Sequence, residues 1–388
     1  MAEAKTDTNR ESRAADFDYV IVGAGASGLL LCAELLSRPE LRNKRIAVVD
    51  DGSFASQNRA WGYWSQQHGP VDDLAEREWT VLDVFADDEN RRLDLTPYRY
   101  RYVRGAAIDD WVRAESHAGH VAWIVDRIEA VRATSDGVIA TGRAGEYRAS
   151  LMFDSRPPHD GPESRVKMCF VGWEIETPAP EFTPDIATFM DFRLCADERV
   201  QFGYVLPLSQ TRALIELASF SHVPWDRQEA EGALGQYLSH VQGVSDWKVL
   251  RSECGELPLI LDPDGGETDP IIPIGRRGGL LRASTGYGFD RMRSHAIQIA
   301  DALTAGSTAV RDLRFKQSKR HAYLDRVLLD VVTNEPNAIE SAFAALFARN
   351  PPDRILRFLD GDSSRIEEAK IVASMPKAPF LRAARRVR

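Results

Sequence analysis

The first fifty residues contain a strand, a glycine-rich turn, a helix and a second strand, and this order restricts the fold more than any other feature. The segment DYVIVGAG is a near-continuous apolar run, and Gly23, Gly25 and Gly28 form a G-x-G-x-x-G pattern. These glycines permit a tight turn, close approach of the backbone to a pyrophosphate at a helix N-terminus, and close helix packing. Asp50 ends the second strand, where a carboxylate can bind the adenosine ribose hydroxyls. The segment therefore predicts a dinucleotide site, for NAD or FAD, over the alternative of a tight structural turn.

The composition excludes several classes of protein. The chain has 388 residues, 44% of them hydrophobic, so it can bury a large core. Its formal net charge of −9 argues against a broad basic surface for nucleic acid. The cysteines lack metal-ligand spacing, so we expect no metal site and reduced thiols, as in the cytoplasm. They are Cys32, Cys169, Cys195 and Cys254.

The N-terminus and the hydropathy pattern predict no membrane-spanning segment. Residues 1–16 are polar and mixed in charge and lack the apolar run of a signal peptide, so we expect a disordered tail. Nowhere do about 18 uncharged apolar residues follow one another, although attachment to a membrane surface stays open.

The pattern changes after residue 185. The segments DIATFMDFRL, RVQFGYVLPL and TRALIELASF predict three strands joined by short turns, which is an antiparallel meander. Such a sheet does not easily continue a parallel one, so residues 160–262 are expected to form a second, substrate-facing layer. The segment from Gly279 to Gly306 predicts a short strand, a glycine-bearing loop and an amphipathic helix. Helical spacing follows after residue 320.

Several short motifs, in order and spacing, together resemble the bacterial flavin-dependent lycopene cyclases. They are Asn58-Arg59-Ala60-Trp61-Gly62-Tyr63-Trp64, Phe153-Asp154-Ser155-Arg156-Pro157, Phe170-Val171-Gly172-Trp173-Glu174, Met190-Asp191-Phe192-Arg193, Tyr204-Val205-Leu206-Pro207 and Ser284-Thr285-Gly286-Tyr287. The resemblance extends from about residue 17 to the C-terminal PKAPFLRAARRV.

The resemblance implies a mixed α/β fold of the flavoprotein monooxygenase type, with a Rossmann-like FAD-binding domain, an antiparallel β substrate domain and a helical C-terminal region. We expect residues 17–65, 98–159 and 263–318 in the FAD-binding domain, 66–97 and 160–262 in the substrate domain, and 319–388 in the helical cap. The implied cofactor is FAD, active when reduced, with NAD(P)H as a possible external reductant. The implied reaction closes rings on an acyclic carotenoid without net redox change.

Ring closure of this kind needs a carboxylic acid in a dry site, because alkenes are weak bases. Glu216 is the first candidate for this acid. In ALIELASF it shares a strand face with Leu214, Ala218 and Phe220, an apolar setting that favours a protonated carboxyl. The alternatives are a glutamate at the edge of the sheet that reaches solvent, or a partner for Arg212 or Arg193. The resemblance favours catalysis, because these cyclases carry an essential glutamate in a matching LIE position.

Asp191 is a candidate second carboxylate, with an ion pair to Arg193 as the equal alternative. For Glu253 and Glu256 we favour the interpretation as acids that flank a turn.

By the same resemblance, further residues are candidates for binding the cofactor. They are Arg59, Asp154, Ser284, Thr285, Gly286 and Tyr287. The Ser284–Tyr287 loop precedes a helix and can present backbone amides to the flavin, with an ordinary N-cap turn as the alternative.

The chain departs from the family pattern in places, which leaves other functions open. Leu217 and Ala218 follow Glu216 where the family often has a polar or acidic residue and a threonine. Arg276-Arg277 replaces small residues, and Ala283 replaces a usual proline. The alternatives are a cyclase relative acting on another polyene or terpenoid, a redox FAD monooxygenase or reductase on the same fold, and a carotenoid-binding or flavin-binding protein without activity.

A hydrophobic polyene substrate predicts peripheral contact with a membrane. The C-terminal PFLRAARRVR combines basic residues with Phe380 and Leu381, which suits anionic lipid, with a solvated terminus as the alternative. The sequence leaves the oligomeric state undetermined.

Overall fold

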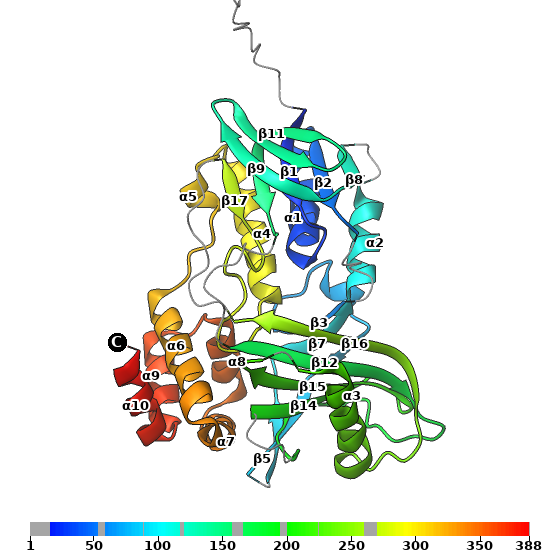
Figure 1. The fold of residues 1–388 in the computed structure, drawn as a ribbon, viewed down its shortest axis with the longest axis vertical. Helices are drawn as coiled ribbons and strands as arrows, with labels where there is room; N and C mark the ends of the chain where they lie inside the picture. The colour runs from blue at the N-terminus through cyan, green and yellow to red at the C-terminus, as the bar shows by residue number, and fades with distance from the viewer. Residues whose placement is uncertain are drawn as a thin grey trace, which may run out of the picture.

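The computed structural model describes residues 16–52, 59–87, 89–116, 120–156, 166–194, 200–223, 225–259 and 270–387. Figure 1 shows a sheet with helices in the upper part of the view, a second large sheet below it, and a group of helices beside the second sheet. The expected tail at residues 1–16, apart from Asp16, lies outside the described residues, as does Cys195.

The first sheet is built around the parallel strands that the N-terminal pattern predicts. Its strand order is β8-β2-β1-β11-β10-β9, and β17 also pairs with β11. Neighbours are parallel, except that β9, β10 and β11 form an antiparallel meander. The strands are β1 (Phe17–Val22), β2 (Ile46–Asp50), β8 (Val121–Val125), β9 (Ile128–Thr134), β10 (Gly137–Gly142), β11 (Glu146–Asp154) and β17 (Ile271–Pro273).

Both faces of this sheet are covered, which explains the continuous apolar run in β1. Ile21 packs in the core beneath the helices, whereas Val20 and Val22 belong to a core on the other face. The helices of this part are α1 (Ala26–Ser37), η1 (Pro39–Leu41), α2 (Gly105–Glu115), α4 (Phe289–Thr304) and α5 (Val310–Leu313). Helix α1 packs against both α2 and α4.

The second sheet has the order β16-β12-β15-β14-β13-β5-β6 and is antiparallel apart from the parallel pair β5 and β13. The meander predicted after residue 185 is confirmed as β13, β14 and β15. The strands are β5 (Val81–Ala86), β6 (Glu89–Asp94), β12 (Lys167–Glu176), β13 (Ile186–Asp191), β14 (Val200–Pro207), β15 (Arg212–Ser221) and β16 (Lys248–Pro258).

The two faces of the second sheet pack against different partners. Helix α3 (Arg227–Gln236) and the π-helical turn η4 (Tyr237–Val241) cover one face through Ile215 and Leu217. The other face, with Leu214 and Phe220, shares a large core with the third sheet and the C-terminal helices. The smaller elements around it are β3 (Ala60–Ser65), η3 (Asp72–Leu74), β4 (Arg77–Trp79) and β7 (Arg99–Arg104), and β3, β7 and β4 form the third sheet.

The C-terminal region is helical, as the spacing predicts. Its elements are α6 (Lys319–Asn334), η5 (Pro336–Ala338), α7 (Ile339–Arg349), α8 (Pro352–Asp360), α9 (Arg365–Ser374) and α10 (Lys377–Arg386). They lie beside the second sheet in Figure 1, where the C-terminus is marked.

One predicted element is wrong. The short strand expected after Gly278 is a series of turns, in which the Leu280 amide bonds to Gly275 and the Arg282 amide to Tyr287. Positive φ angles at Gly275 and Gly279 keep this segment from extending. The strand that joins the sheet is β17, which lies a few residues earlier.

The side chains of the last helix only partly follow the prediction of a lipid-facing segment. Leu381 is 58% exposed, but Phe380 packs against the large core. Arg382 and Arg386 form ion pairs with Glu335. The expected insertion of Phe380 is therefore corrected, because this ring is used for packing inside the cap.

Candidate active site

The glycine turn after β1 has the geometry of a phosphate cradle. Gly23 has φ +99°, and a Cβ on Gly28 would lie 2.0 Å from the carbonyl oxygen of Gly23, so helix and strand are in close contact. A Cβ on Gly25 would meet no atom within 4 Å. Gly25 is the N-cap of α1, and no side chain accepts a hydrogen bond from the first backbone amides of this helix. These amides can therefore bind an anion.

Charged residues gather around this turn. Asp50 accepts hydrogen bonds from the amides of Ala24 and Gly52, both at 2.8 Å. Burial lowers the pKa of Arg59, and the charge of Asp50 partly opposes this effect. Burial also lowers the pKa of Arg276, and the nearby charge of Arg59 lowers it further. Two neighbouring guanidinium groups suit an anion such as a pyrophosphate.

Asp154 lies at the carboxyl end of β11, fully buried, and its carboxylate is engaged inside the protein. Arg156 donates to both of its oxygens at 2.7 to 3.2 Å, and Arg277 lies 3.5 Å away. Asp154 therefore positions two arginines at the edge of the sheet, and this arrangement disfavours a direct contact between its carboxylate and a cofactor.

The Ser284–Tyr287 loop contacts the cap and the second sheet through its side chains. The Ser284 hydroxyl donates to Asp325 of α6 at 2.7 Å, and Arg282 donates to the same carboxylate. The Tyr287 hydroxyl lies 2.7 Å from that of Tyr204. A cofactor role for these two side chains is disfavoured, which leaves the loop backbone and Thr285, whose Oγ1 accepts from the Tyr287 amide at 3.4 Å.

Gly286 has φ +75°, a conformation that favours glycine, and a Cβ there would lie 2.9 Å from a Leu257 methyl group. The loop thus lies close against β16.

Glu216 is half-buried on the inner face of β15, the face that contributes Leu214 and Ala218 to the large core. Tyr204 is its partner on β14. Burial, with a smaller contribution from the charge of Glu253, raises the pKa of Glu216 to about 8. A carboxyl in this state is a proton donor near neutral pH.

Aromatic rings surround this carboxyl. Phe189 is their centre, stacked on Tyr287 at 6.0 Å and edge-on to Tyr100 and Tyr204 at 5.6 and 5.8 Å. Trp64 lies edge-on to Tyr287 at 4.6 Å. Burial raises the pKa of the three tyrosines, whose hydroxyls therefore stay neutral. Ring faces in a desolvated site can stabilise a cation.

A second acid, Glu253, lies on the same face of the sheet. Gly172 of β12 pairs with Glu216 on one side and with Glu253 of β16 on the other. A Cβ on Gly172 would lie 3.2 Å from Cγ and 3.3 Å from Oε1 of Glu253. The interpretation of Glu253 and Glu256 as acids that flank a turn is wrong, because both lie within β16.

Asp191 lies on the opposite face from Glu216, in the layer of α3. Its carboxylate is fully buried and accepts hydrogen bonds from Arg193 at 2.5 Å, Tyr237 at 2.8 Å and Gln242 at 3.2 Å. The structure therefore favours the ion pair over the catalytic hypothesis, because the sheet separates this satisfied carboxylate from Glu216.

Two further acids with raised pKa values are not predicted by the sequence. Asp360 at the end of α8 accepts a hydrogen bond from the Trp64 indole, and burial raises its pKa well above the usual range. Burial likewise raises the pKa of Asp290, at the start of α4, to about 6. Neither has a sequence signal, because each depends on the packing of the C-terminal helices against α4 and the third sheet.

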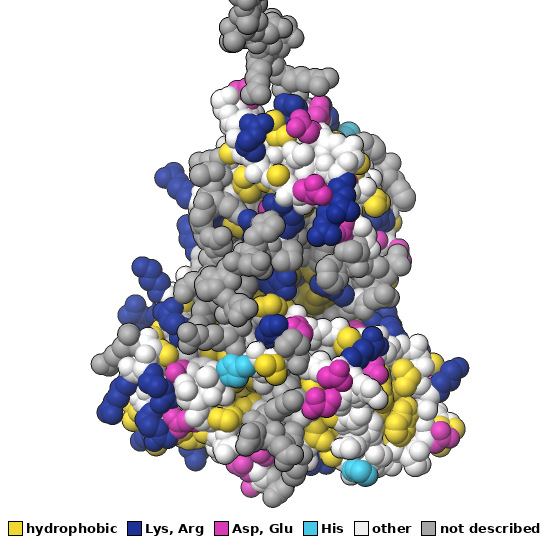
Figure 2. Space-filling view, in the orientation of Figure 1, with side chains coloured by type: hydrophobic (Ala, Val, Ile, Leu, Met, Phe, Trp, Pro, Cys, Tyr) yellow, Lys and Arg dark blue, Asp and Glu magenta, His cyan; other side chains and the backbone are white. Residues whose placement is uncertain are grey.

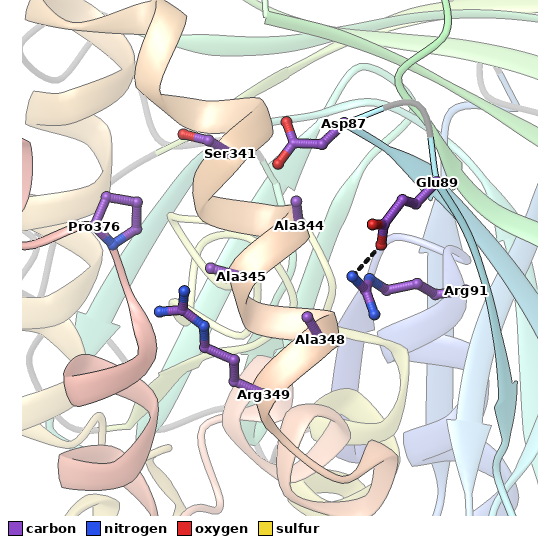
Figure 3. A pocket seen from close by; sticks show the side chains of 9 residues that line it. All are labelled: Asp87, Glu89, Arg91, Ser341, Ala344, Ala345, Ala348, Arg349 and Pro376. Carbon is purple, nitrogen blue, oxygen red and sulfur yellow. Dashed lines mark hydrogen bonds and ion pairs between the residues drawn. The ribbon is translucent and has the colours of Figure 1, made fainter.

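A surface hollow of about 380 Å³ lies on the outer side of α7 (Figure 3). Helix α7 separates it from Glu216, since Phe343 and Phe347 of the same helix pack into the large core. It is lined by Asp87, Glu89, Arg91, Ser341, Ala344, Ala345, Ala348, Arg349 and Pro376.

The described ranges hold neither a metal-binding cluster nor a membrane-spanning helix. No three His, Cys, Asp or Glu side chains gather there as a metal ion would require. None of the described helices combines the length and apolar character needed to cross a bilayer.

Comparison with known proteins gives a family and a fold. The family model described as lycopene cyclase protein matches residues 18–385. A lycopene beta-cyclase of a Paracoccus species is 28% identical, covering 94% of this chain and 95% of the relative. That of Pantoea ananas is 25% identical, covering 95% and 97%. The structure of Klebsiella pneumoniae HpxO complexed with FAD and uric acid is similar with a TM-score of 0.63 and 14% identity, covering 92% and 97%. The predicted Rossmann-like fold of FAD enzymes is confirmed.

Proposed function

Because the chain belongs to the lycopene cyclase family, we propose that it closes the end groups of an acyclic, lycopene-like carotenoid into rings without net oxidation or reduction. The observation that carries this proposal is the position of Glu216 on an apolar sheet face among aromatic rings, where burial raises the pKa of its carboxyl. Such a reaction makes the enzyme an isomerase of the intramolecular lyase type.

The proposed reaction uses one proton and returns it. Glu216 gives its proton to one carbon of the terminal alkene, which leaves a tertiary carbocation on the other. The π electrons of the neighbouring double bond form the ring C–C bond and move the positive charge to a ring carbon. Loss of a proton from an adjacent carbon then restores a double bond. The tyrosine and phenylalanine rings stabilise the cation, by about 0.5 to 2 kcal/mol per ring, and exclude water.

FAD is the proposed cofactor, and the uncapped N-terminus of α1 with Gly25 supports it. Arg59 and Arg276 would face its pyrophosphate, and Asp50 the ribose end. When bound in reduced form, the flavin supplies negative potential beside the developing cation. NAD(P)H is the proposed external reductant.

The test is anaerobic incubation of the protein with photoreduced FAD and lycopene, with NMR of the product, because cyclisation leaves the mass unchanged. We expect the parent and Glu256→Gln to form rings, since Glu256 is exposed and paired with Lys167. Glu216→Gln should lose at least 100-fold in rate. Ring formation by Glu216→Gln, or NAD(P)H consumption in proportion to product, contradicts the proposal.

We also propose peripheral membrane contact through the outer faces of α9 and α10, because the substrate is confined to bilayers. Ile366, Val372 and Leu381 are 70%, 51% and 58% exposed there. Figure 2 shows Lys and Arg side chains gathered over the C-terminal helices, at the lower left. Four exposed cations of α9 and α10 form no ion pair with the described residues, unlike Arg382 and Arg386; they are Arg365, Lys370, Lys377 and Arg385.

The charge of this face complements anionic lipid. The acids of α9 are neutralised within the cap, Glu367 by Arg357 and Glu368 by Arg320. Each basic residue near an anionic surface is worth about 1 kcal/mol, so replacing Lys370 by Gln should weaken binding roughly 5-fold.

Cosedimentation with phosphatidylglycerol and phosphatidylcholine vesicles tests this surface. We expect binding to the anionic vesicles only, and a loss of it when Ile366, Val372 and Leu381 are all replaced by Ser. Val125→Ser is the control, because Val125 is 82% exposed on β8 in the first sheet. Unchanged binding of the triple variant refutes the assignment.

A further inference from the structure

We propose that Glu253 is the second carboxyl of this site, a positioning residue whose negative charge keeps the reactive proton on Glu216. The inference rests on the proposed function of Glu216 and adds a residue that supports it. A polar residue directly after Glu216, where Leu217 stands, is not needed for this role.

The position directly after Glu216 could not supply a neighbouring carboxyl. Side chains alternate along a strand, and Leu217 packs in the layer of α3 on the other face of the sheet. A second acid beside Glu216 has to come from another strand, at a paired position on the same face.

Gly172 makes this approach across the sheet possible. Glu216 and Glu253 flank it in register, two strands apart, so their Cα atoms are about 10 Å from each other. Because Gly172 has no side chain, the space between the two glutamates is open. The Glu253 side chain already bends into this space, since its Oε1 would lie only 3.3 Å from a Cβ placed on Gly172. Any larger residue at 172 would stand between the two carboxyls.

The surroundings of the two acids differ, and this decides which one holds the proton. Burial raises the pKa of Glu253. The charges of Arg251, which lies 3.5 Å away, and of Arg104 act in the opposite direction and offset part of this rise. The charge of Glu174 opposes the two arginines. The Tyr102 hydroxyl, which accepts a hydrogen bond from Arg251 at 2.8 Å, is another titratable group near Glu253.

Glu216 lacks such cations among the described residues. The groups that face it are the tyrosines Tyr100, Tyr204 and Tyr287 and the carboxylate of Glu253, and both burial and that charge raise its pKa. Glu253 is therefore the anion of the pair and Glu216 the acid.

This arrangement resets the catalyst. When the Glu216 O–H bond breaks and the proton forms a C–H bond with the alkene, two carboxylates face each other across Gly172. Their repulsion favours return of a proton to Glu216 when the ring cation loses one, so that no proton is gained or lost overall.

The pH dependence of kcat/KM in Glu253→Gln tests the inference. Without the neighbouring charge, Glu216 should lose its proton at lower pH. The fall of kcat/KM on the alkaline side of the pH profile should therefore occur roughly one pH unit lower than in the parent. We expect about fivefold lower activity than the parent at pH 8 and activity within about twofold at pH 6. Glu253→Asp keeps the charge and should restore most of the alkaline side of the profile, and Glu256→Gln should match the parent.

Infrared spectroscopy provides a readout that needs no turnover. The carboxylic C=O band that is absent in Glu216→Gln should persist to higher pH in the parent than in Glu253→Gln. The inference is overturned if Glu253→Gln leaves both the carboxylic C=O band and the alkaline side of the kcat/KM profile unchanged. It is also overturned if Glu253→Asp shifts that profile as far as Glu253→Gln does. A shifted band in a protein that forms no rings would support the role of Glu253 and contradict the cyclase function instead.

Discussion

Alanine substitutions at Gly25 and Gly28 should separate cofactor binding from stability, although both glycines belong to one turn. An added methyl group at Gly25 meets no atom within 4 Å, and its φ of −79° suits any residue. At Gly28 the methyl carbon would lie 2.0 Å from the Gly23 carbonyl oxygen and 3.2 Å from an Ile21 methyl group. The first change fills the space proposed for a phosphate, and the second forces helix and strand apart.

The magnitudes follow from these contacts. Alanine in place of glycine at an N-cap costs about 1 kcal/mol or less, and a methyl group without space in a packed interior costs about 3 kcal/mol. For a chain of 388 residues, with an unfolding entropy of roughly 2 cal/mol/K per residue, Gly28→Ala should lower Tm by roughly 4 °C and Gly25→Ala by roughly 1 °C. Loss of one hydrogen bond to a charged phosphate, roughly 1.5 to 3 kcal/mol, should raise the Kd of FAD about 10- to 150-fold in Gly25→Ala.

The assay is a fluorescence titration of apoprotein with FAD, beside thermal unfolding of each apoprotein. If Gly25→Ala binds FAD as the parent does, the phosphates do not lie at this turn. If Gly28→Ala unfolds at the temperature of the parent, the close contact of helix and strand is wrong.

Three further predictions concern Glu216, Asp191 and the cap. The raised pKa of Glu216 means that the folded state binds more protons than the unfolded chain between pH 4.5 and about 8, so this group lowers stability as pH rises through that window; Glu216→Gln should therefore have a higher Tm than the parent at pH 8, and an equal or lower Tm there would contradict the shift. Tyr237→Phe removes a hydrogen bond to the buried Asp191 and should cost about 1 to 3 kcal/mol in urea unfolding, with unchanged kcat, whereas a large loss of kcat would return Asp191 to the active site. Asp325→Ala leaves Arg282 buried without its ion pair and should cost about 3 to 5 kcal/mol. Glu335→Ala removes a solvent-screened surface pair and should cost far less; equal costs would refute this contrast.

The sequence predicts what depends on local pattern. The roles of Gly23 and Gly28 follow from a fixed spacing between one strand and one helix, and alternation within a single strand suffices to place Glu216 on an apolar face. The meander was equally predictable, because its turns are short.

Features that depend on long-range pairing were out of reach. Glu253 joins Glu216 only because β12 pairs with both β15 and β16, and the residue between them is a glycine. The partners of Asp191 include Tyr237, 46 residues away in an irregular turn. The Ser284 hydroxyl bonds to Asp325 on a cap helix whose docking no motif encodes.

The parallel pairing of β5 with β13 has a consequence during synthesis. The β5–β6 hairpin leaves the ribosome about a hundred residues before the strand that completes its sheet. Translation proceeds at roughly 5 to 20 residues per second, so the free edge of this hairpin is exposed for about 5 to 20 seconds. During this time Leu82 and Val84 lack the core in which they pack in the folded protein. A nascent chain of this kind is a natural client for chaperones, and slow translation of the intervening segment should promote its aggregation.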